Sequence, residues 1–146
     1  MADLTDVQRI IDEGGHRGVV SAVRADGSIQ SSVVAAGITG HPVTGEPSVA
    51  FTTAGGSVKL RLWRARPQAT IVFQAGYPWA SAGGPVDLIG YADPREGIGA
   101  ARLREVLRTV FTAAGGTHDD WDAYDRAMEE QVRSAVFIRP DRIFAM

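Results

Sequence analysis

The sequence contains no cysteine and no asparagine, and Lys59 is the only lysine among its 15 lysine and arginine residues. The absence of cysteine excludes disulfides, thiolate nucleophiles and iron–sulfur clusters, and removes the usual ligands of structural zinc. No apolar run approaches the length of roughly 20 residues that crosses a bilayer, and the N-terminal MADLTDVQRI lacks the basic and apolar blocks of a signal peptide. We therefore expect a cytoplasmic protein whose chemistry depends on carboxylates, hydroxyls, histidine or a bound cofactor.

The net charge is also small. A formal charge of −2 leaves no broad surplus of lysine and arginine of the kind that neutralises the phosphates of a duplex. We expect no nucleic-acid partner and no membrane segment. The length of 146 residues, with 45% hydrophobic content, predicts one domain that spans residues 1–146.

The N-terminal half of the sequence predicts one helix followed by three strands. Apolar residues at helical spacing after Asp3, which can act as the N-cap, predict a helix over residues 3–13. The pair Asp26-Gly27 between two runs rich in valine and isoleucine predicts a hairpin of strands 18–24 and 29–38. A third strand, PSVAFTT, leads to the double glycine Gly55-Gly56.

The C-terminal half predicts three helices and three strands. A short helix over residues 57–66 precedes a buried strand ATIVFQA, a loop GYPWASAGG and a strand over residues 86–92. Residues 93–96 (DPRE) form a capping-box pattern that predicts the start of a long helix, and Thr117 is the expected cap of a second one before the last strand, SAVFIRP. The predicted fold is mainly β (α+β): a six-stranded, largely antiparallel barrel with peripheral helices.

The segment AFTTAGGSVKLRLWRARPQATIVF contains the residues best suited to bind a ligand. Thr53 ends a strand, two glycines follow, and Ser57 can cap a helix whose first turn holds Lys59 and Arg61. The free N–H groups and the dipole of a helix N-terminus stabilise an anion there. Basic residues on a short helix are also typical of a solvated surface, but the segment lacks acidic partners at i,i+4 spacing, which favours an anionic ligand.

Helical geometry limits how many basic residues can bind one phosphate. Lys59 and Arg66 project to one side of the helix, whereas Arg61 and Arg64 project to another. We expect Arg61 to be the partner of Lys59, with less support for the other two arginines.

The pattern T-T-x-x-x-S-x-K-x-R, followed by R-x-x-P and an apolar strand, resembles the split β-barrel superfamily of pyridoxamine 5'-phosphate oxidase-like proteins. Within it, the sequence is more similar to the flavin/deazaflavin oxidoreductases that use coenzyme F420. The resemblance extends from the first helix to the terminal VFIRPDRIF. One position departs from it, because Leu62 stands where the family often has asparagine.

The resemblance implies a homodimer that binds its cofactor in a groove at the subunit interface. The implied cofactor-binding residues are Gln30, Ser31, Ser32, Val33, Thr53, Ser57, Lys59, Arg61 and Trp79. Ser57, Lys59 and Arg61 surround the phosphate, and residues 30–33 follow the polar edge of the ring. Trp79 and Tyr77 are expected to come from the neighbouring subunit and to line the site of the ring or the substrate. Simple packing accounts for Trp79 equally well.

The implied reaction is hydride transfer from reduced F420 to an unsaturated small-molecule acceptor. Two alternatives stay open: an FMN-binding oxidoreductase of the same fold, and a non-catalytic carrier of F420 or flavin. The sequence identifies neither a catalytic residue nor the substrate. His16, His41 and His118 lack the spacing of a metal site and are expected to be solvated or to cap turns.

Overall fold

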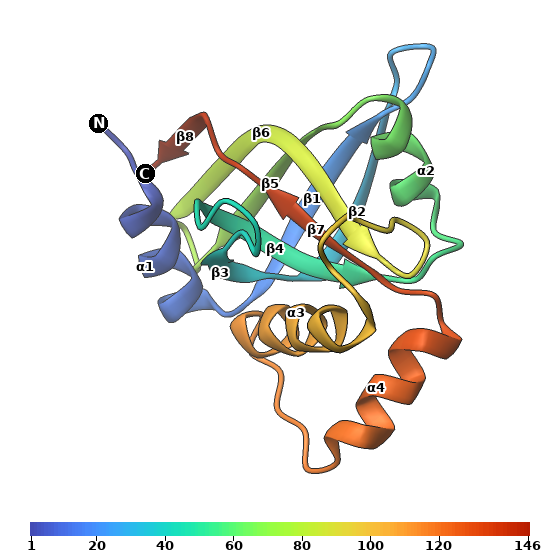
Figure 1. The fold of residues 1–146 in the computed structure, drawn as a ribbon. Helices are drawn as coiled ribbons and strands as arrows, with labels where there is room; N and C mark the ends of the chain where they lie inside the picture. Colours follow the sequence, from blue (N-terminus) through green and yellow to red (C-terminus); the bar gives the residue numbers. More distant parts are fainter.

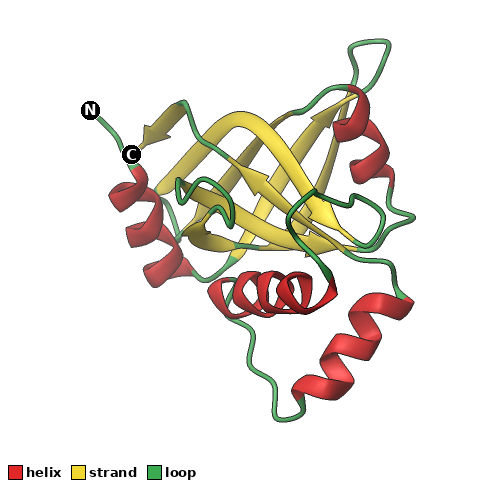
Figure 2. Ribbon diagram, in the orientation of Figure 1, coloured by secondary structure: helices red, strands yellow, loops and turns green.

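The computed structural model describes residues 1–146 as four helices and eight strands (Figures 1 and 2). The helices are α1 (Leu4–Gly14), α2 (Val58–Ala65), α3 (Ala100–Ala113) and α4 (Trp121–Glu130). The strands are β1 (Arg17–Val23), β2 (Ile29–Ala35), β3 (Gly37–Gly40), β4 (Pro47–Thr53), β5 (Gln68–Gln74), β6 (Trp79–Gly90), β7 (Ser134–Ile138) and β8 (Arg142–Ala145). None of the four helices has the length and apolar character needed to span a bilayer.

All strand pairs are antiparallel, in the order β2-β1-β5-β6-β7-β4-β3, with β8 paired to β6. The long strand β6 joins two half-sheets. Its residues 79–85 pair with β5 in the first half-sheet, which also contains β1, β2 and β8, and its residues 86–90 pair with β7 in the second, which also contains β3 and β4. Figure 1 shows β6 bending over the top of the barrel between the two halves. The result is a split, partly closed barrel with helices at its periphery (Figure 2).

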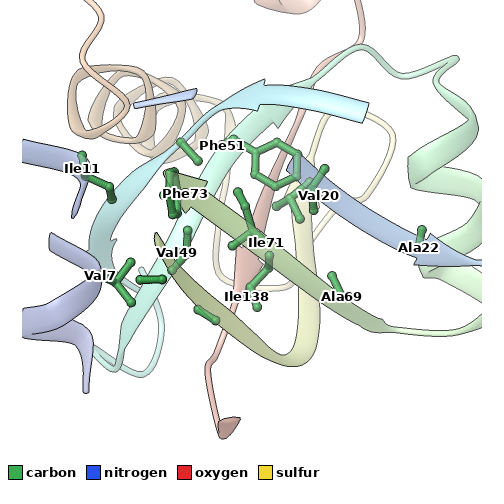
Figure 3. Packing of buried hydrophobic residues seen from close by; sticks show 14 of the residues in the cluster. Val7, Ile11, Val20, Ala22, Val49, Phe51, Ala69, Ile71, Phe73 and Ile138 are labelled. Atoms are coloured by element: carbon green, nitrogen blue, oxygen red, sulfur yellow. The ribbon is translucent and has the colours of Figure 1, made fainter. Parts of the chain in front are cut away.

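The main hydrophobic core lies inside this barrel. Figure 3 shows side chains from α1, β1, β4, β5 and β7 converging there, among them Val7, Val20, Phe51, Ile71 and Ile138. Each is at most 1% exposed. Burial of this apolar surface is the main favourable contribution to the stability of the fold.

A second core lies between α3, α4 and the outer face of the β4–β7 half-sheet. It contains Leu107 and Val110 from α3, Tyr124 from α4, and Phe137 from β7. Burial raises the pKa of Tyr124 to about 12, and its hydroxyl donates to the carbonyl of Leu107 at 3.0 Å. Because both faces of this half-sheet are covered, every residue of β7 is buried, as expected for its continuous apolar sequence.

The structure confirms the antiparallel α+β split barrel but corrects the number of strands, which is eight rather than six. Strand 29–38 is interrupted at Ala36 and forms β2 and β3, and the terminal segment adds β8 after β7. The expected loop GYPWASAGG belongs largely to β6 from Trp79 onward. Strand β5 is not fully buried, because its residues alternate between the core and the surface.

Two predicted helix starts are also wrong. The helix expected at residues 93–96 begins at Ala100, because the Asp93 carboxylate binds Arg64 and Ser134 instead of capping a helix. The next helix is capped by Asp120, whose side chain accepts the N–H of Ala123, and not by Thr117. The predicted Asp3 cap is confirmed as part of a capping box.

Candidate anion-binding groove

The connection from β4 to α2 places a helix N-terminus next to the end of a strand. Ser57 caps α2 by accepting the N–H of Leu60 at 3.4 Å, as the sequence indicates. The N–H groups of Val58 and Lys59, in the first turn, have no partner within the helix. Because α2 buries Leu60 and Trp63 in the core, its N-terminus has a fixed position beside β4.

A groove of about 490 Å³ opens beside this helix start. It lies between the ends of β2 and β4, the start of α2, the C-terminal end of α3 and the residue before β7. Its lining residues are Val33, Val34, Ala35, Thr52, Thr53, Lys59, Phe111, Ala114, Gly115, Gly116 and Arg133. The volume falls in the range of roughly 300–1,000 Å³ that is usual for small-molecule sites.

The groove carries positive charge and no compensating negative charge. Lys59 and Arg133 both line it, and neither has a carboxylate partner within 4.0 Å. No aspartate, glutamate or histidine lines the groove, and its neutral hydrogen-bonding side chains are the hydroxyls of Thr52 and Thr53. The arrangement therefore suits an anionic ligand with a partly apolar body.

The other basic residues of α2 have different surroundings. Arg64 binds Asp93 through two hydrogen bonds of 2.7 and 2.8 Å, across 29 residues of sequence. Arg61 and Arg66 are exposed, make no ion pair and do not line the groove. Within one protomer, the structure thus separates Arg61 from Lys59, the pair expected to act together.

The four predicted ring-contacting residues of β2 alternate between two faces of the strand. Gln30 and Ser32 are half-buried, whereas Ser31 and Val33 are exposed, and only Val33 lines the groove. Gln30 accepts a hydrogen bond from Arg24, and the Ser31 hydroxyl lies 3.0 Å from that of Ser21. The Ser32 hydroxyl is buried and has no hydrogen-bond partner.

Trp79 lies on the outer face of the first half-sheet, at the start of β6 and opposite Gln74. It does not line the groove of its own protomer, and neither does the exposed Tyr77. Of the nine predicted residues, Val33, Thr53 and Lys59 line the groove, and Ser57 caps the helix on which Lys59 lies.

The structure adds lining residues that the sequence does not single out, chiefly Arg133 and Phe111. Phe111 appears in the sequence as part of the apolar face of a helix. Arg133 directly precedes β7, and only the pairing of Thr53 with Ser134 reveals that it lies beside the predicted ligand-binding segment. No local motif of either residue indicates this position.

The histidines lie outside the groove, and two of them cap turns as expected. The Nδ1 atom of His41 accepts the N–H groups of Val43 and Thr44, and that of His118 accepts the N–H of Asp120. His41 is nevertheless buried rather than solvated, because its Nε2 atom lies 2.7 Å from Asp87 and its ring packs on Phe137.

No known family model matches the sequence, and no curated protein sequence matches it either. Solved structures do match. An FMN-binding, pyridoxamine 5'-phosphate oxidase-related protein from Nostoc punctiforme superposes with a TM-score of 0.65 at 13% identity, over 99% of this chain and 84% of the other. The chain has the pyridoxamine 5'-phosphate oxidase-like split-barrel fold.

Two further split-barrel structures illustrate what proteins of this fold bind. An F420 reductase matches with a TM-score of 0.60 and 18% identity, over 90% of this chain and 91% of the other. A heme-binding protein from Mycobacterium smegmatis matches with a TM-score of 0.63 and 14% identity, over all of this chain but 55% of the other. The predicted resemblance is thus confirmed at the level of the fold, whose members include cofactor-binding proteins.

Proposed function

We propose that this protein is an F420-dependent oxidoreductase that transfers hydride to an unsaturated small-molecule acceptor. The observation that carries the proposal is the groove in which its only lysine, Lys59, lies without an ion-pair partner at the N-terminus of α2. A phosphate there gains the charge of Lys59 and the free N–H groups of the first helical turn. The similarity to an F420 reductase over 90% of the chain supports this choice of cofactor.

The lining residues are suited to binding and orientation rather than to acid–base catalysis. Neither a carboxylate nor a histidine is present in the groove, so the redox chemistry comes from the cofactor, which supplies the hydride when bound. Val33, Val34 and Phe111 offer apolar surface that excludes water from the ring. The hydroxyls of Thr52 and Thr53 can donate hydrogen bonds to the ligand and fix its position.

FMN is the alternative cofactor, supported by the similarity to the FMN-binding protein. Its phosphate would bind the same groups, since Lys59 and the start of α2 do not distinguish a phosphate monoester from a diester. A non-catalytic carrier of either cofactor would use the same groove. Heme fits less well, because no histidine, methionine, cysteine or tyrosine of the same protomer lines the groove to serve as an axial ligand.

We further propose that two protomers associate through the outer face of the first half-sheet. The registers align Val33, Val19, Val72, Ser81 and Phe144 in one row across β2, β1, β5, β6 and β8. The four apolar members of this row, the sheet-face row, are between 37% and 63% exposed. An exposed row that is apolar at four of five positions is typical of an interface.

Val33 belongs both to the sheet-face row and to the groove lining. A partner protomer seated on this row would therefore reach the edge of the groove and could bring Trp79 and Tyr77 to the ligand. This shared residue supports a cofactor site at the subunit interface.

Purified protein from a host that lacks F420 tests the choice of cofactor. We expect colourless protein that quenches the fluorescence of added F420 on titration and binds FMN more weakly. Lys59→Ala should weaken F420 binding by about tenfold or more, since it removes a charged contact with the phosphate. Arg126→Ala, which removes one exposed and unpaired charge from α4, is the matched control and should leave affinity unchanged.

Three outcomes would contradict parts of this proposal. Yellow protein with bound FMN would favour the alternative cofactor. F420 binding without turnover of a panel of enones and quinones would favour the carrier. Equal affinities of the wild type and Lys59→Ala would overturn the phosphate-binding role of Lys59.

A further inference from the structure

We propose that Arg133 is a second anion-binding residue of the groove and contacts a phosphate of the bound ligand together with Lys59. This inference rests on the proposed function for the identity of the ligand. It does not follow from the residues of the β4–α2 segment, because Arg133 comes from the turn before β7, 74 positions after Lys59 in the sequence.

The guanidinium of Arg133 is held in place but not neutralised. Its Nε donates to the Gln131 side chain at 2.7 Å, and its Nη1 lies 3.4 Å from the carbonyl oxygen and 3.5 Å from the hydroxyl of Thr52. All of these partners are uncharged. An arginine presents five N–H donors in a planar fork, so donors remain free for a bidentate contact with a phosphate.

The turn that delivers Arg133 has an unusual backbone. Val132 has φ of 52°, and it is the only non-glycine residue of the chain with positive φ. A β-branched residue in this left-handed region is strained and persists only where its surroundings impose the conformation. Such strain at a groove wall is consistent with a residue held in place for a ligand.

The strained turn packs directly on the glycine loop before α2. The Gly55 N–H donates to the carbonyl of Gln131 at 3.0 Å, and a Cβ atom on Gly55 would lie 2.5 Å from the carbonyl oxygen of Val132. The loop that leads to Lys59 and the turn that leads to Arg133 are therefore fixed to each other. This coupling pre-organises both cations before binding.

Two cations without a lining carboxylate favour a ligand with at least two negative charges near this end of the groove. A phosphate monoester dianion satisfies this, as does a phosphodiester with a neighbouring carboxylate. The phosphate-free precursors of both cofactors, riboflavin and the corresponding ribityl deazaflavin, have the same rings and ribityl chain but lack the phosphate charges.

Titration of the purified protein with four compounds tests the role of Arg133. The compounds are F420, FMN, and the phosphate-free counterpart of each. For whichever pair binds, Arg133→Gln should lower the affinity for the phosphorylated compound by about tenfold or more. The affinity for its phosphate-free counterpart should change by less than about twofold. Arg133→Lys should restore part of the affinity, and Arg126→Gln, on the exposed face of α4, should have no effect.

A loss of affinity that is equal for phosphorylated and phosphate-free compounds would overturn the inference, because it would indicate damage to the groove rather than loss of a charge contact. An unchanged affinity for the phosphorylated compound would overturn it as well. If the wild type binds none of the four compounds, the proposed function is wrong. Inorganic phosphate then serves as the probe: weaker phosphate binding by Arg133→Gln supports the inference, and equal or absent binding overturns it.

Discussion

Gly55 and Gly56 are neighbours in the loop before α2, but their surroundings differ. A Cβ atom on Gly55 would lie 2.5 Å from the backbone oxygen of Val132, whereas a Cβ atom on Gly56 meets nothing within 4 Å. Gly55→Ala must therefore displace the turn at Val132 and with it the following residue, Arg133. Gly56→Ala requires no displacement of neighbouring atoms. Glycine is required at position 55 because the backbone there lies close to the backbone of Val132, but it is not required at position 56.

We expect Gly55→Ala to lower the free energy of unfolding by about 1–3 kcal/mol, the usual cost of overpacking. It should also weaken binding of the phosphorylated cofactor. Gly56→Ala should be neutral or stabilising by up to about 1 kcal/mol, because it restricts the unfolded chain. Urea unfolding and cofactor titration of both variants measure these effects, and equal behaviour of the two variants would contradict the close packing of Gly55 on Val132.

Among single residues, the sequence indicates those that the β4–α2 segment contributes to the groove, but it does not indicate Arg133. The glycine pair, Ser57 and Lys59 are adjacent in the chain, so their common position at a helix start can be inferred from spacing. Arg133 becomes their neighbour only through the pairing of Thr53 with Ser134. A contact between residues so far apart depends on strand register, which local sequence does not specify.

Helix α2 is anchored to the β6–β7 end of the barrel by Arg64. Its guanidinium binds Asp93, which also accepts the Ser134 hydroxyl at 2.6 Å. The hydrogen bonds from Arg64 lower the pKa of Asp93, with burial opposing and Ser134 adding to the effect. A carboxylate with a lowered pKa stabilises the folded state above its unfolded pKa of about 3.9, and this stabilisation is lost as the pH falls through the folded pKa.

Arg64→Gln should therefore lower the melting temperature at pH 7, by about 2–4 °C for a cost near 1 kcal/mol. We expect no larger effect because the Arg64 side chain is 38% exposed and its ion pair is screened by solvent. The difference from the wild type should begin to shrink as the pH falls below the unfolded pKa of about 3.9, and should disappear as the pH falls through the lowered pKa of folded Asp93. Arg66→Gln, on the same helix but unpaired, is the control for thermal scans across this pH range. A difference that stays constant with pH would contradict the role of the Asp93 charge.

The same interaction explains why the predicted start of α3 is wrong. Residues 93–96 carry a strong helix-start pattern, but the Asp93 side chain is used by Arg64 from a distant helix, and the chain continues through Gly97 with φ of 85° before α3 begins. Where the capping side chain makes no contact with a distant part of the molecule, the predicted helix boundaries agree better with the structure. The predicted α1, for example, differs from the observed helix by one residue at each end.

For the whole molecule, hairpin signals and apolar runs are sufficient to predict an antiparallel α+β barrel. They predict the second half of β6 but not its first half, which contains Trp79, two glycines and Pro85 and has the composition of a loop. This segment is a strand because β5 and β8 pair with its two edges. Strand β8 in turn pairs only with this first half of β6, so neither segment can be predicted without the other.

The proposed dimer gives the sheet-face row a role that the isolated protomer does not explain. Val72 lies at the centre of the row, on β5, so Val72→Glu introduces a charge in the middle of the interface while its side chain points away from the core. Burying two such charges against apolar partners is costly, and we expect the dimer to dissociate at micromolar concentration. Val43→Glu, which alters an exposed valine in the loop before β4, is the matched control and should leave the oligomeric state unchanged.

Light scattering coupled to size-exclusion chromatography measures the oligomeric state, and cofactor titration of the same samples shows whether the site needs both subunits. If the groove is completed by the partner, Val72→Glu should lose cofactor affinity together with dimerisation, although Val72 itself does not line the groove. A monomeric wild-type protein, or a Val72→Glu variant that remains dimeric, would contradict the interface. A monomeric variant with full affinity would instead place the entire cofactor site within one protomer, around Lys59 and Arg133.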